Sequence, residues 1–503
     1  MKKQTRRRFL ACSGVGALGM MAGLPSASAS ESLESSHAPS SDGGNYRFSQ
    51  EIPIGDIYDI VVAGGGPAGT AAAICASRLG AKVLLVEAMG CLGGMSTSGY
   101  VSAFDPMANG ERMLVGGFMK EIVETLYSRG YMSPGIDPDS WRKKYHVWSP
   151  FQPEGLKTLF DEKVVEAGVH VLFFTKVIGA DVSSGVVNGV VLSNVEGLKY
   201  IKAKTFIDAT GDAVLSDVCG VKYREAGRDT EKIMPATLAS LFAGVDWSKP
   251  GLATQSPKGV ELIEKEFAAG NFFQCDRHLV GISKIGETVG YLNGGHIFDL
   301  NSVNIESLTK GMMTGRRVVR ECHEFLKKYS ENCKNMELVS TAPVMGVRES
   351  RRIEGVYELS FNDLMNTRQF PDQVGVFNKF VDIHPYDCTK EEHERFLHEK
   401  DKSGRLGIGK MFGMPYSILV PKGGWKNLWV AGRCSSSDVM AHGSIRVQPS
   451  CSMLGQAAGT AAIQSIRTGQ PAYDIDTEAL VKTLREAGAY LPQEKLSKKM
   501  TLA

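Results

Sequence analysis

The chain has 503 residues, enough for two or three domains with a sizeable hydrophobic core. Its 43% hydrophobic and 22% charged residues are ordinary for a folded protein, which excludes a mainly disordered chain and a multi-span membrane protein. The formal net charge is +2, but the first 29 positions hold five basic residues and no acid, which leaves 52 basic against 55 acidic residues, or −3, for the remainder. No basic field remains to attract a phosphate backbone, so we expect no nucleic-acid partner.

The N-terminal segment has the order of an export signal. Arg6–Arg8 precede a mild apolar stretch over 11–24, and Ala27–Ala29 offer a small-residue cleavage site. This pattern is typical of a twin-arginine signal peptide over 1–29, which exports proteins that have already folded; a basic N-terminus on a cytosolic helix is the alternative. The apolar stretch is too short and too rich in glycine for a permanent membrane anchor. We therefore expect a periplasmic or otherwise exported protein.

The cysteines do not form a framework of metal ligands or disulfides. There are ten, nine of them after the expected cleavage, and nowhere do two stand in a Cys-x-x-Cys spacing. This argues against iron–sulfur, zinc-ribbon and c-type haem sites, and we expect no metal site. Folding in a reducing cytoplasm before export favours scattered buried thiols.

Beyond a flexible Ser-rich linker over 30–56, the chain begins with a strand, a glycine turn, a helix and a second strand. The strands are expected at 60–63 and 82–86, with the helix between them ending near Leu79. In the turn, Gly64 permits the sharp bend, Gly66 lets the backbone approach a pyrophosphate, and Gly69 lets the helix pack against the strand. Glu87 follows the second strand, where a carboxylate can accept hydrogen bonds from ribose hydroxyls. The spacing predicts a dinucleotide site in an α/β fold with a parallel, Rossmann-like sheet.

Later segments continue the alternation and divide the chain. We expect a helix over 153–167 and a strand over 169–174. A β-meander follows, with strands at 180–182, 189–193 and 199–203, and then a buried strand over 206–208. Further on we expect an amphipathic helix over 307–328, a strand over 427–430 and a helix over 450–467. The nucleotide-binding domain is then formed by 57–215 and 401–470, with an interleaved α+β substrate or cap domain over 216–400 and a C-terminal helix and tail over 471–503.

Several motifs in this order resemble the FAD-dependent oxidoreductase family, in its glutathione-reductase-like class with a fused substrate domain. Only one nucleotide fingerprint is present, so the resemblance implies FAD as the cofactor and no second site for free nicotinamide. The motifs beyond the Gly64 turn are Gly90–Gly99, Gly116–Phe118, Ala209–Asp212, Gly346–Ile353, Val430–Arg433 and Arg446–Gly459.

The resemblance implies a role for each part of the expected FAD site. The pyrophosphate would be held by Gly64, Gly66, Pro67, Ala68 and Gly69, and closed over by Ala209, Thr210 and Gly211, with Asp212 fixing that turn. Glu87 would hold the ribose, and Val177 would pack near the adenine. The isoalloxazine ring would lie beside Gly94, Met95, Ser96 and Thr97. The ribityl chain or phosphate would contact Gly432 and Arg433, and the N-terminus of the helix that carries Gly455, Gln456 and Ala457 would face the flavin pyrimidine.

His442 and Arg446 are the candidate catalytic residues, because they lie between the Gly432 turn and that last helix. Histidine can move a proton near neutral pH, and arginine can orient a carboxylate or carbonyl group; a structural role for His442 is the alternative. His384 could line the same site. Within the basic cluster of Arg348, Arg351 and Arg352, one residue contacts substrate or all three form salt bridges with Glu349 and Glu354. Cys91 is expected to pack, since it has no partner cysteine.

These features predict an exported enzyme that transfers a hydride between flavin N5 and a small organic substrate. An exported enzyme meets little free nicotinamide, so electrons would be exchanged with a quinone-linked or other redox partner or with a small acceptor. The direction of the reaction is left open. The alternative is a non-catalytic flavin-binding scaffold or sensor, and a flavoprotein that modifies RNA is opposed by the export signal and the charge.

Overall fold

The computed structural model describes residues 49–144, 146–402 and 405–492. The expected signal peptide and the first part of the linker therefore lie outside the described residues. The helices are α1 (Pro67–Arg78), α2 (Gly117–Ser128), α3 (Pro138–Lys143), α4 (Pro153–Ala167), α5 (Val214–Cys219), α6 (Pro257–Ala268), α7 (Ile305–Tyr329), α8 (Phe361–Met365), α9 (Lys390–Lys402), α10 (Val439–Ile445), α11 (Gln448–Thr468) and α12 (Thr477–Glu486).

The strands that build the largest sheet are β1 (Ile54–Ala63), β2 (Val83–Val86), β5 (His170–Leu172), β6 (Lys176–Ser183), β7 (Val186–Asn194), β8 (Gly197–Asp208) and β19 (Leu428–Val430). The others are β3 (Ala103–Phe104), β4 (Ser149–Pro150), β9 (Tyr223–Glu225), β10 (Ala236–Thr237), β11 (Ser240–Ala243), β12 (Ser283–Lys284), β13 (Gly290–Leu292), β14 (His296–Ile297), β15 (Glu337–Thr341), β16 (Arg351–Ile353), β17 (Gln373–Phe377) and β18 (Phe412–Pro415).

The largest sheet confirms the predicted α/β fold. Its parallel part has the order β5-β2-β1-β8-β19, and all its pairs run in the same direction. Successive residues of β1 point to opposite faces: Ile60 and Val62 join one hydrophobic core, and Val61 and Ala63 join another. Strands buried on both faces need continuous apolar runs, which is why the run at 60–63 could be recognised.

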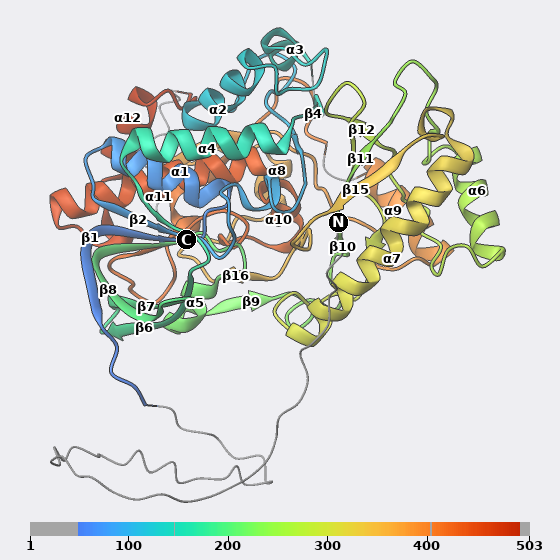
Figure 1. Ribbon diagram of the computed structural model, residues 1–503. Coiled ribbons are helices and arrows are strands. Elements are labelled where there is room, and N and C mark those ends of the chain that lie inside the picture. The colour runs from blue at the N-terminus through green and yellow to red at the C-terminus, as the bar shows by residue number, and fades with distance from the viewer. Residues whose placement is uncertain (1–48, 145, 403–404, 493–503) are drawn as a thin grey trace, which may run out of the picture. The chain divides into compact units, whose positions relative to one another are not determined.

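Helices α1, α2, α4, α11 and α12 lie together on one side of the parallel part of this sheet, whereas α5 lies on the other side, where the antiparallel β6–β7 hairpin also packs (Figure 1). The contact between α1 and α11 is close because small residues face each other. A Cβ atom added to Gly455 would lie 2.0 Å from the Ala68 carbonyl oxygen, and one added to Gly459 would lie 2.3 Å from that of Ala72. The Ala/Gly composition of α11 therefore brings the C-terminal helix against the first one.

The meander differs from the prediction at its last strand. The two strands expected at 199–203 and 206–208 are one continuous strand, β8. Along one edge of β8, the first half pairs with β7 and the second half pairs with β19. Along the other edge, β8 pairs with β1. The prediction left out Lys204 and Thr205, but the strand continues through them because it pairs with β1 there.

A second hydrophobic core lies around the antiparallel sheet β12-β13-β11-β15 and helix α7. Apart from Tyr100, its buried residues fall between Ala236 and Met345. The predicted domain over 216–400 extends further, whereas Leu359, Leu364 and Phe377 belong to the first core. The chain has already returned to the nucleotide-binding side by β17, which pairs with β18. Among the described helices, none combines the length and the apolar character needed to cross a bilayer.

Candidate functional site

The glycines of the turn between β1 and α1 have two different tasks. Gly64 has φ +93° and its Cβ would lie 2.5 Å from the Ala209 carbonyl oxygen, while a Cβ on Gly69 would lie 1.7 Å from the Gly64 carbonyl oxygen. Both positions are closed by packing. Gly66 is open, because a Cβ there would meet no atom within 4 Å. Helix α1 begins after it with Pro67 and has no side-chain cap, so its first N–H groups face this open space.

Glu87 ends β2 beside the same turn. Its Oε2 accepts a hydrogen bond of 2.6 Å from the Gly65 N–H, and its Oε1 accepts one of 2.7 Å from the Met89 N–H. Burial raises the pKa of this carboxyl, and these backbone donors oppose the rise. Val177 lies nearby in β6, two residues after Thr175, whose N–H donates to the Glu87 carbonyl oxygen. Glu87 and β6, which carries Val177, are thus joined beside the glycine turn.

The segment predicted beside the flavin ring rests directly on the glycine turn. The Gly93 N–H donates to the Gly65 carbonyl oxygen at 2.7 Å, and a Cβ on Gly94 would lie 3.0 Å from Gly66 Cα. Met95 lines the main cavity, and Ser96 is buried in the short helical turn that it ends. The Thr97 hydroxyl donates instead to the Leu92 carbonyl oxygen at 2.5 Å, so it holds the loop together and is not free for the ring.

A residue absent from the prediction, Asp208, fixes the turn that contains Ala209, Thr210 and Gly211. Its fully buried carboxylate accepts hydrogen bonds from the N–H and hydroxyl of both Thr210 and Ser216, at 2.7–3.0 Å. Asp212, to which the prediction gave this task, accepts instead from Arg433 at 2.8 Å. A buried acid at the end of a strand was the signal in the sequence that could have identified Asp208.

The turn after β19 brings Arg433 to this place. Gly432 has φ +92°, and its Cβ would lie 2.9 Å from that of Ala68 at the start of α1. Arg433 also donates to the Ser350 hydroxyl at 3.1 Å, and it lines the main cavity. Gly432 and Arg433 are therefore brought together with the Gly64 turn.

Three predicted residues do not lie at the N-terminus of the helix that carries them. Helix α11 begins at Gln448, so Gly455, Gln456 and Ala457 are about two turns inside it and line no part of the main cavity. Gly455 packs on Ala68, and Gln456 Oε1 accepts from the Phe118 N–H at 3.0 Å. The residues of this helix that reach the cavity are Val447, at its N-cap, and Gln448.

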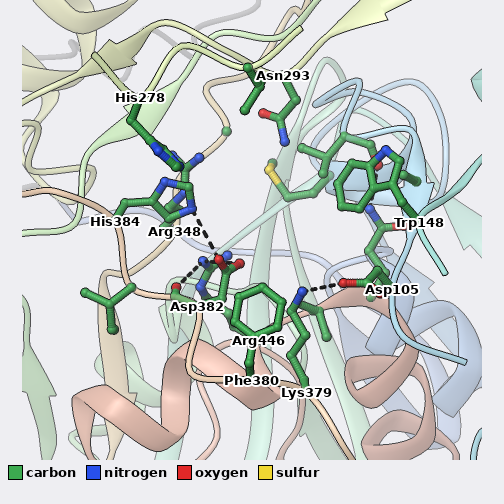
Figure 2. A pocket seen from close by; sticks show the side chains of 18 of the residues that line it. Asp105, Trp148, His278, Asn293, Arg348, Lys379, Phe380, Asp382, His384 and Arg446 are labelled. Atoms are coloured by element: carbon green, nitrogen blue, oxygen red, sulfur yellow. Dashed lines mark hydrogen bonds and ion pairs between the residues drawn. The ribbon is translucent and has the colours of Figure 1, made fainter. Parts of the chain in front are cut away.

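A cavity of about 810 Å³ is lined by residues of both cores (Figure 2). Such a volume is typical of a cofactor or small-ligand site. Its charged lining is mostly basic. The cationic residues are Arg348, Lys379, Arg405, Arg433 and Arg446, the acids are Asp105 and Asp382, and the histidines are His146, His278 and His384.

The two acids each hold one of these cations. Lys379 Nζ forms a buried ion pair with Asp105, and Arg446 Nη2 donates to the Asp382 carboxylate at 3.2 Å and to its carbonyl oxygen at 3.0 Å. Burial raises the pKa of Asp382, but Lys379, His384 and Arg446 outweigh it and hold that pKa well below its ordinary value. The Nε atom of Arg446 is buried and has no hydrogen-bond partner among the described residues.

His442 does not reach the cavity, so its predicted catalytic role is wrong on geometry. The side chain is 1% exposed, and its Nε2 lies 3.0 Å from the Arg348 carbonyl oxygen. Burial, together with Arg352 and Arg446, lowers the pKa of His442 well below its ordinary value. The ring is therefore neutral, and its Nε2–H donates to that carbonyl. This is the structural role that the sequence left open as the alternative.

The cluster of three arginines divides into two kinds. Arg352 lies 3.4 Å from Glu349 and Arg351 lies 2.9 Å from Asp217, as expected for salt bridges. Arg348 is 7% exposed and lines the cavity, and its Nη1 donates to the Pro235 carbonyl oxygen at 2.6 Å and to the Thr237 hydroxyl at 2.9 Å. Among the described residues it forms no ion pair. Burial and Arg446 lower the pKa of Arg348 to about 9.

Histidines gather beside Arg348 at one end of the cavity (Figure 2). His384 Nδ1 lies 2.9 Å from Nε2 of His296, and the ring centroids of His384 and His278 are 5.5 Å apart. His296 and His278 come from the second domain, so sequence distance concealed this group. No set of three or more His, Cys, Asp or Glu side chains within the described ranges is arranged to hold a metal ion.

Comparison with known proteins identifies the family of this chain. A family model described as "FAD dependent oxidoreductase" matches residues 59–484, and the chain belongs to this family. Dihydrolipoyl dehydrogenase from Trypanosoma brucei brucei is 53% identical over 47 residues, which is 9% of this chain and only 10% of that relative's length.

Solved structures with related folds are more distant. A geranylgeranyl bacteriochlorophyll reductase-like protein from Thermoplasma acidophilum is 13% identical, with 86% of this chain and 83% of that chain covered and a TM-score of 0.43. A flavin-dependent brominase is 16% identical, with 86% and 83% covered and a TM-score of 0.44. L-proline dehydrogenase from P. horikoshii is 14% identical, with 86% and 99% covered and a TM-score of 0.38.

The residues present fit FAD. The open space at Gly66, the uncapped start of α1 and the carboxylate of Glu87 suit the pyrophosphate and ribose, and Arg433 reaches from this turn to the cavity. When bound, FAD supplies a ring that accepts or donates a hydride. The nine described cysteines are all unpaired, and seven of them are buried, as the sequence predicted.

Proposed function

We propose that this FAD-dependent oxidoreductase exchanges a hydride with a small organic carboxylate, and that it is exported by a twin-arginine signal. The observation that carries the proposal is the charge of the cavity: five Lys or Arg side chains line it, against two acids. A preformed basic cavity attracts an anion and selects against a neutral compound of the same shape.

The arrangement of the cations supports a specific place for the carboxylate. Lys379 is paired with Asp105, and Arg433 is paired with Asp212 outside the lining. Arg348 is buried at the cavity wall and has only neutral acceptors among the described residues. A buried guanidinium is stabilised most by an anion with two acceptor oxygens. Arg348 would therefore bind the carboxylate, with the unpartnered Nε of Arg446 orienting the substrate beside it.

Apolar walls would keep water from the reacting end of the substrate. Trp148, Tyr291 and Phe380 line the cavity together with Met95 and Val101. Exclusion of water strengthens the interactions of the arginines with an anion and protects a hydride in transfer. A site of this kind supports catalysis over a flavin-binding scaffold, which has no need of a buried anion-binding arginine.

Export carries a consequence for the electron partner. An exported enzyme meets little free nicotinamide, and the described residues hold no cluster that could bind a relay metal. We therefore infer that electrons are exchanged with a quinone-linked or other separate redox protein, or with a small acceptor.

The test uses the purified protein loaded with FAD. The cofactor is first released and identified by mass. The flavin, oxidised or reduced with dithionite, is then mixed without oxygen with short carboxylates and, as matched controls, with their uncharged amides. We expect some carboxylates to change the flavin spectrum and their amides not to do so. Indifference to every compound in both redox states would support the scaffold, and an equal response to the amides would defeat the carboxylate assignment.

A further inference from the structure

A row of four titratable side chains leads from the cavity into the second domain. His384 Nε2 lies 3.5 Å from Asp382 Oδ1, and its Nδ1 lies 2.9 Å from His296 Nε2. His296 Nδ1 lies in turn 3.1 Å from Asp276 Oδ1. Asp276 and His296 are buried, whereas Asp382 and His384 line the cavity. The row therefore has one end at the substrate position and one end in the core.

The protonation state of Asp276, at the buried end of this row, determines which nitrogen of His296 carries a proton. Asp276 accepts from the backbone N–H groups of His278 at 3.1 Å and His296 at 2.8 Å. Burial raises its pKa, but His296 and these bonds outweigh it and keep that pKa far below the ordinary value. Asp276 is thus a carboxylate, and the Nδ1–H of His296 donates to it. The Nε2 atom of His296 is then the nitrogen that contacts His384 Nδ1, so that the other ring nitrogen of His384, Nε2, lies toward the cavity, 3.5 Å from Asp382 Oδ1.

We propose that His384 exchanges the proton of the reaction with the substrate through Nε2, and that His296 and Asp276 position it. This inference rests on the proposed function. In the oxidising direction, the hydroxyl or amine proton of the substrate goes to His384 Nε2 while the hydride of the adjacent C–H bond goes to bound FAD, and the C–O or C–N single bond becomes a double bond. The reducing direction reverses both transfers.

The charges around His384 couple this proton to the binding of an anion. Asp382 faces it from its own segment, His296 and His278 face it from the second domain, and Arg348 faces it from the segment before β16. Enclosure and the Arg348 charge lower the pKa of His384 well below its ordinary value, so its ring is neutral at neutral pH. A carboxylate on Arg348 offsets that positive charge and raises the His384 pKa. Between the two pKa values, binding of the carboxylate takes up a proton.

The experiment measures this proton directly. Formate and methoxyacetate are titrated into the FAD-loaded protein by calorimetry, at several pH values from 5 to 8, in buffers with different ionisation enthalpies; both probes stay ionised over this range. We expect net uptake of up to about one proton per carboxylate bound, largest between the pKa of His384 in the free protein and its raised pKa in the complex. His384→Gln should abolish the uptake while the flavin remains bound, and it should lower the rate of the proton-coupled redox step by roughly 10²–10⁴ and flatten its pH profile.

Two further variants separate positioning from folding. His296→Gln should keep the uptake but move its pH midpoint, because His384 loses the ring that fixes its tautomer. His323→Gln is the matched control, since His323 is half-buried elsewhere in the second domain and contacts the Met336 carbonyl oxygen at 2.9 Å. It should behave as the wild type.

The outcomes distinguish the two proposals. No binding or turnover of any carboxylate would defeat the proposed function and this inference together. Carboxylate binding by the wild type without proton uptake at any pH would overturn the inference alone, and so would wild-type uptake in His384→Gln. If the His384→Gln protein does not fold, the wild-type titration alone can still overturn the inference.

Discussion

His442 donates a hydrogen bond from Nε2 to the backbone carbonyl oxygen of Arg348, at 3.0 Å. The histidine thus stands behind the wall of the cavity and holds in place the segment that carries the buried arginine. The position of His442 in the chain predicts a catalytic role, but this histidine acts on the substrate only through its neighbour Arg348.

The His442 contact predicts a loss of stability and affinity but no change in the proton-coupled step. His442→Ala leaves a buried carbonyl without a donor, which costs about 1–3 kcal/mol. We expect a lower temperature of unfolding, a higher KM for the carboxylate and an unchanged pH profile of the redox step. A flattened pH profile in this variant, measured by stopped-flow mixing, would return the proton donor to His442.

The glycine turn predicts that cofactor loading and folding can be separated. Gly66→Val places a side chain in open space, so the protein should fold with wild-type stability and contain no flavin. Gly69→Ala places a methyl group against the Gly64 carbonyl oxygen and should destabilise the fold itself. Gly179→Ala is the neutral control, because its Cβ would lie at an ordinary 3.6 Å from Val191. Circular dichroism and the ratio of flavin to protein absorbance measure the two effects; a Gly66→Val protein that is yellow would contradict the assignment.

Arg348 is predicted to bind the carboxylate with a planar pair of N–H groups. Arg348→Lys keeps a positive charge but loses that geometry, and we expect KM to rise by roughly 10–100-fold, which corresponds to about 1.5–3 kcal/mol for hydrogen bonds to a charged group. Flavin content should not change. Arg351→Lys is the matched control, since Arg351 pairs with Asp217 and does not line the cavity. Equal KM values for the two variants would remove Arg348 from the binding site.

The dependence of stability on pH can be predicted at Glu121. Arg78 lies 2.7 Å and Lys163 lies 2.9 Å from this carboxylate, and their hydrogen bonds lower its pKa from 4.5 to about 2. A lowered pKa in the folded state contributes stability above pH 4.5, and this stability is lost as the pH falls through 4.5 toward 2. Glu121→Gln should therefore destabilise the protein at pH 7 by about 0.5–1 kcal/mol, as for a partly exposed pair, and the difference should shrink in acid.

Denaturant unfolding at several pH values measures this difference. Glu124→Gln serves as the control on the same helix, because the pair of Glu124 with Lys120 is exposed and spans 3.8 Å. A difference for Glu121→Gln that does not change with pH would mean that packing, not charge, stabilises this contact.

The export proposal predicts where the protein accumulates. Arg6, Arg7 and Arg8 replaced together by Lys should leave folded, flavin-containing precursor in the cytoplasm, since the pathway reads the arginines while folding proceeds independently. Fractionation with detection of the flavin distinguishes the compartments. Export of the Lys variant at the wild-type rate would exclude the twin-arginine route.

Local patterns in the sequence predict the nucleotide-binding half well. The apolar runs of β1 and β2, the glycines between them and the acid at Glu87 all act on close neighbours, so spacing along the chain determines their geometry. The helix expected over 153–167 is observed with the same bounds as α4. The same reasoning misplaced the boundary within β8, because the partner that supports that strand, β1, lies some 140 residues away.

The cavity was harder to predict because it is built from distant segments. Asp276, His296 and His384 are spread over more than 100 positions, and no spacing rule connects them. His442 and Gln456 carry the right chemistry on the right segments but face the packing side. Which face of a helix is buried depends on its neighbours, here α1, α2 and the Arg348 segment.

The close packing of Gly455 and Gly459 on Ala68 and Ala72 sets the order of events during synthesis. Helix α1 is made early, but the surface that covers it belongs to a helix that ends at Thr468. The nucleotide-binding half therefore remains incomplete on the ribosome until nearly the whole chain has emerged, and α1 exposes apolar surface for that time. We therefore expect FAD to be loaded only after α11 has packed on α1, and a chain that stops before α11 should be a substrate for chaperones and proteases instead of a smaller flavoprotein.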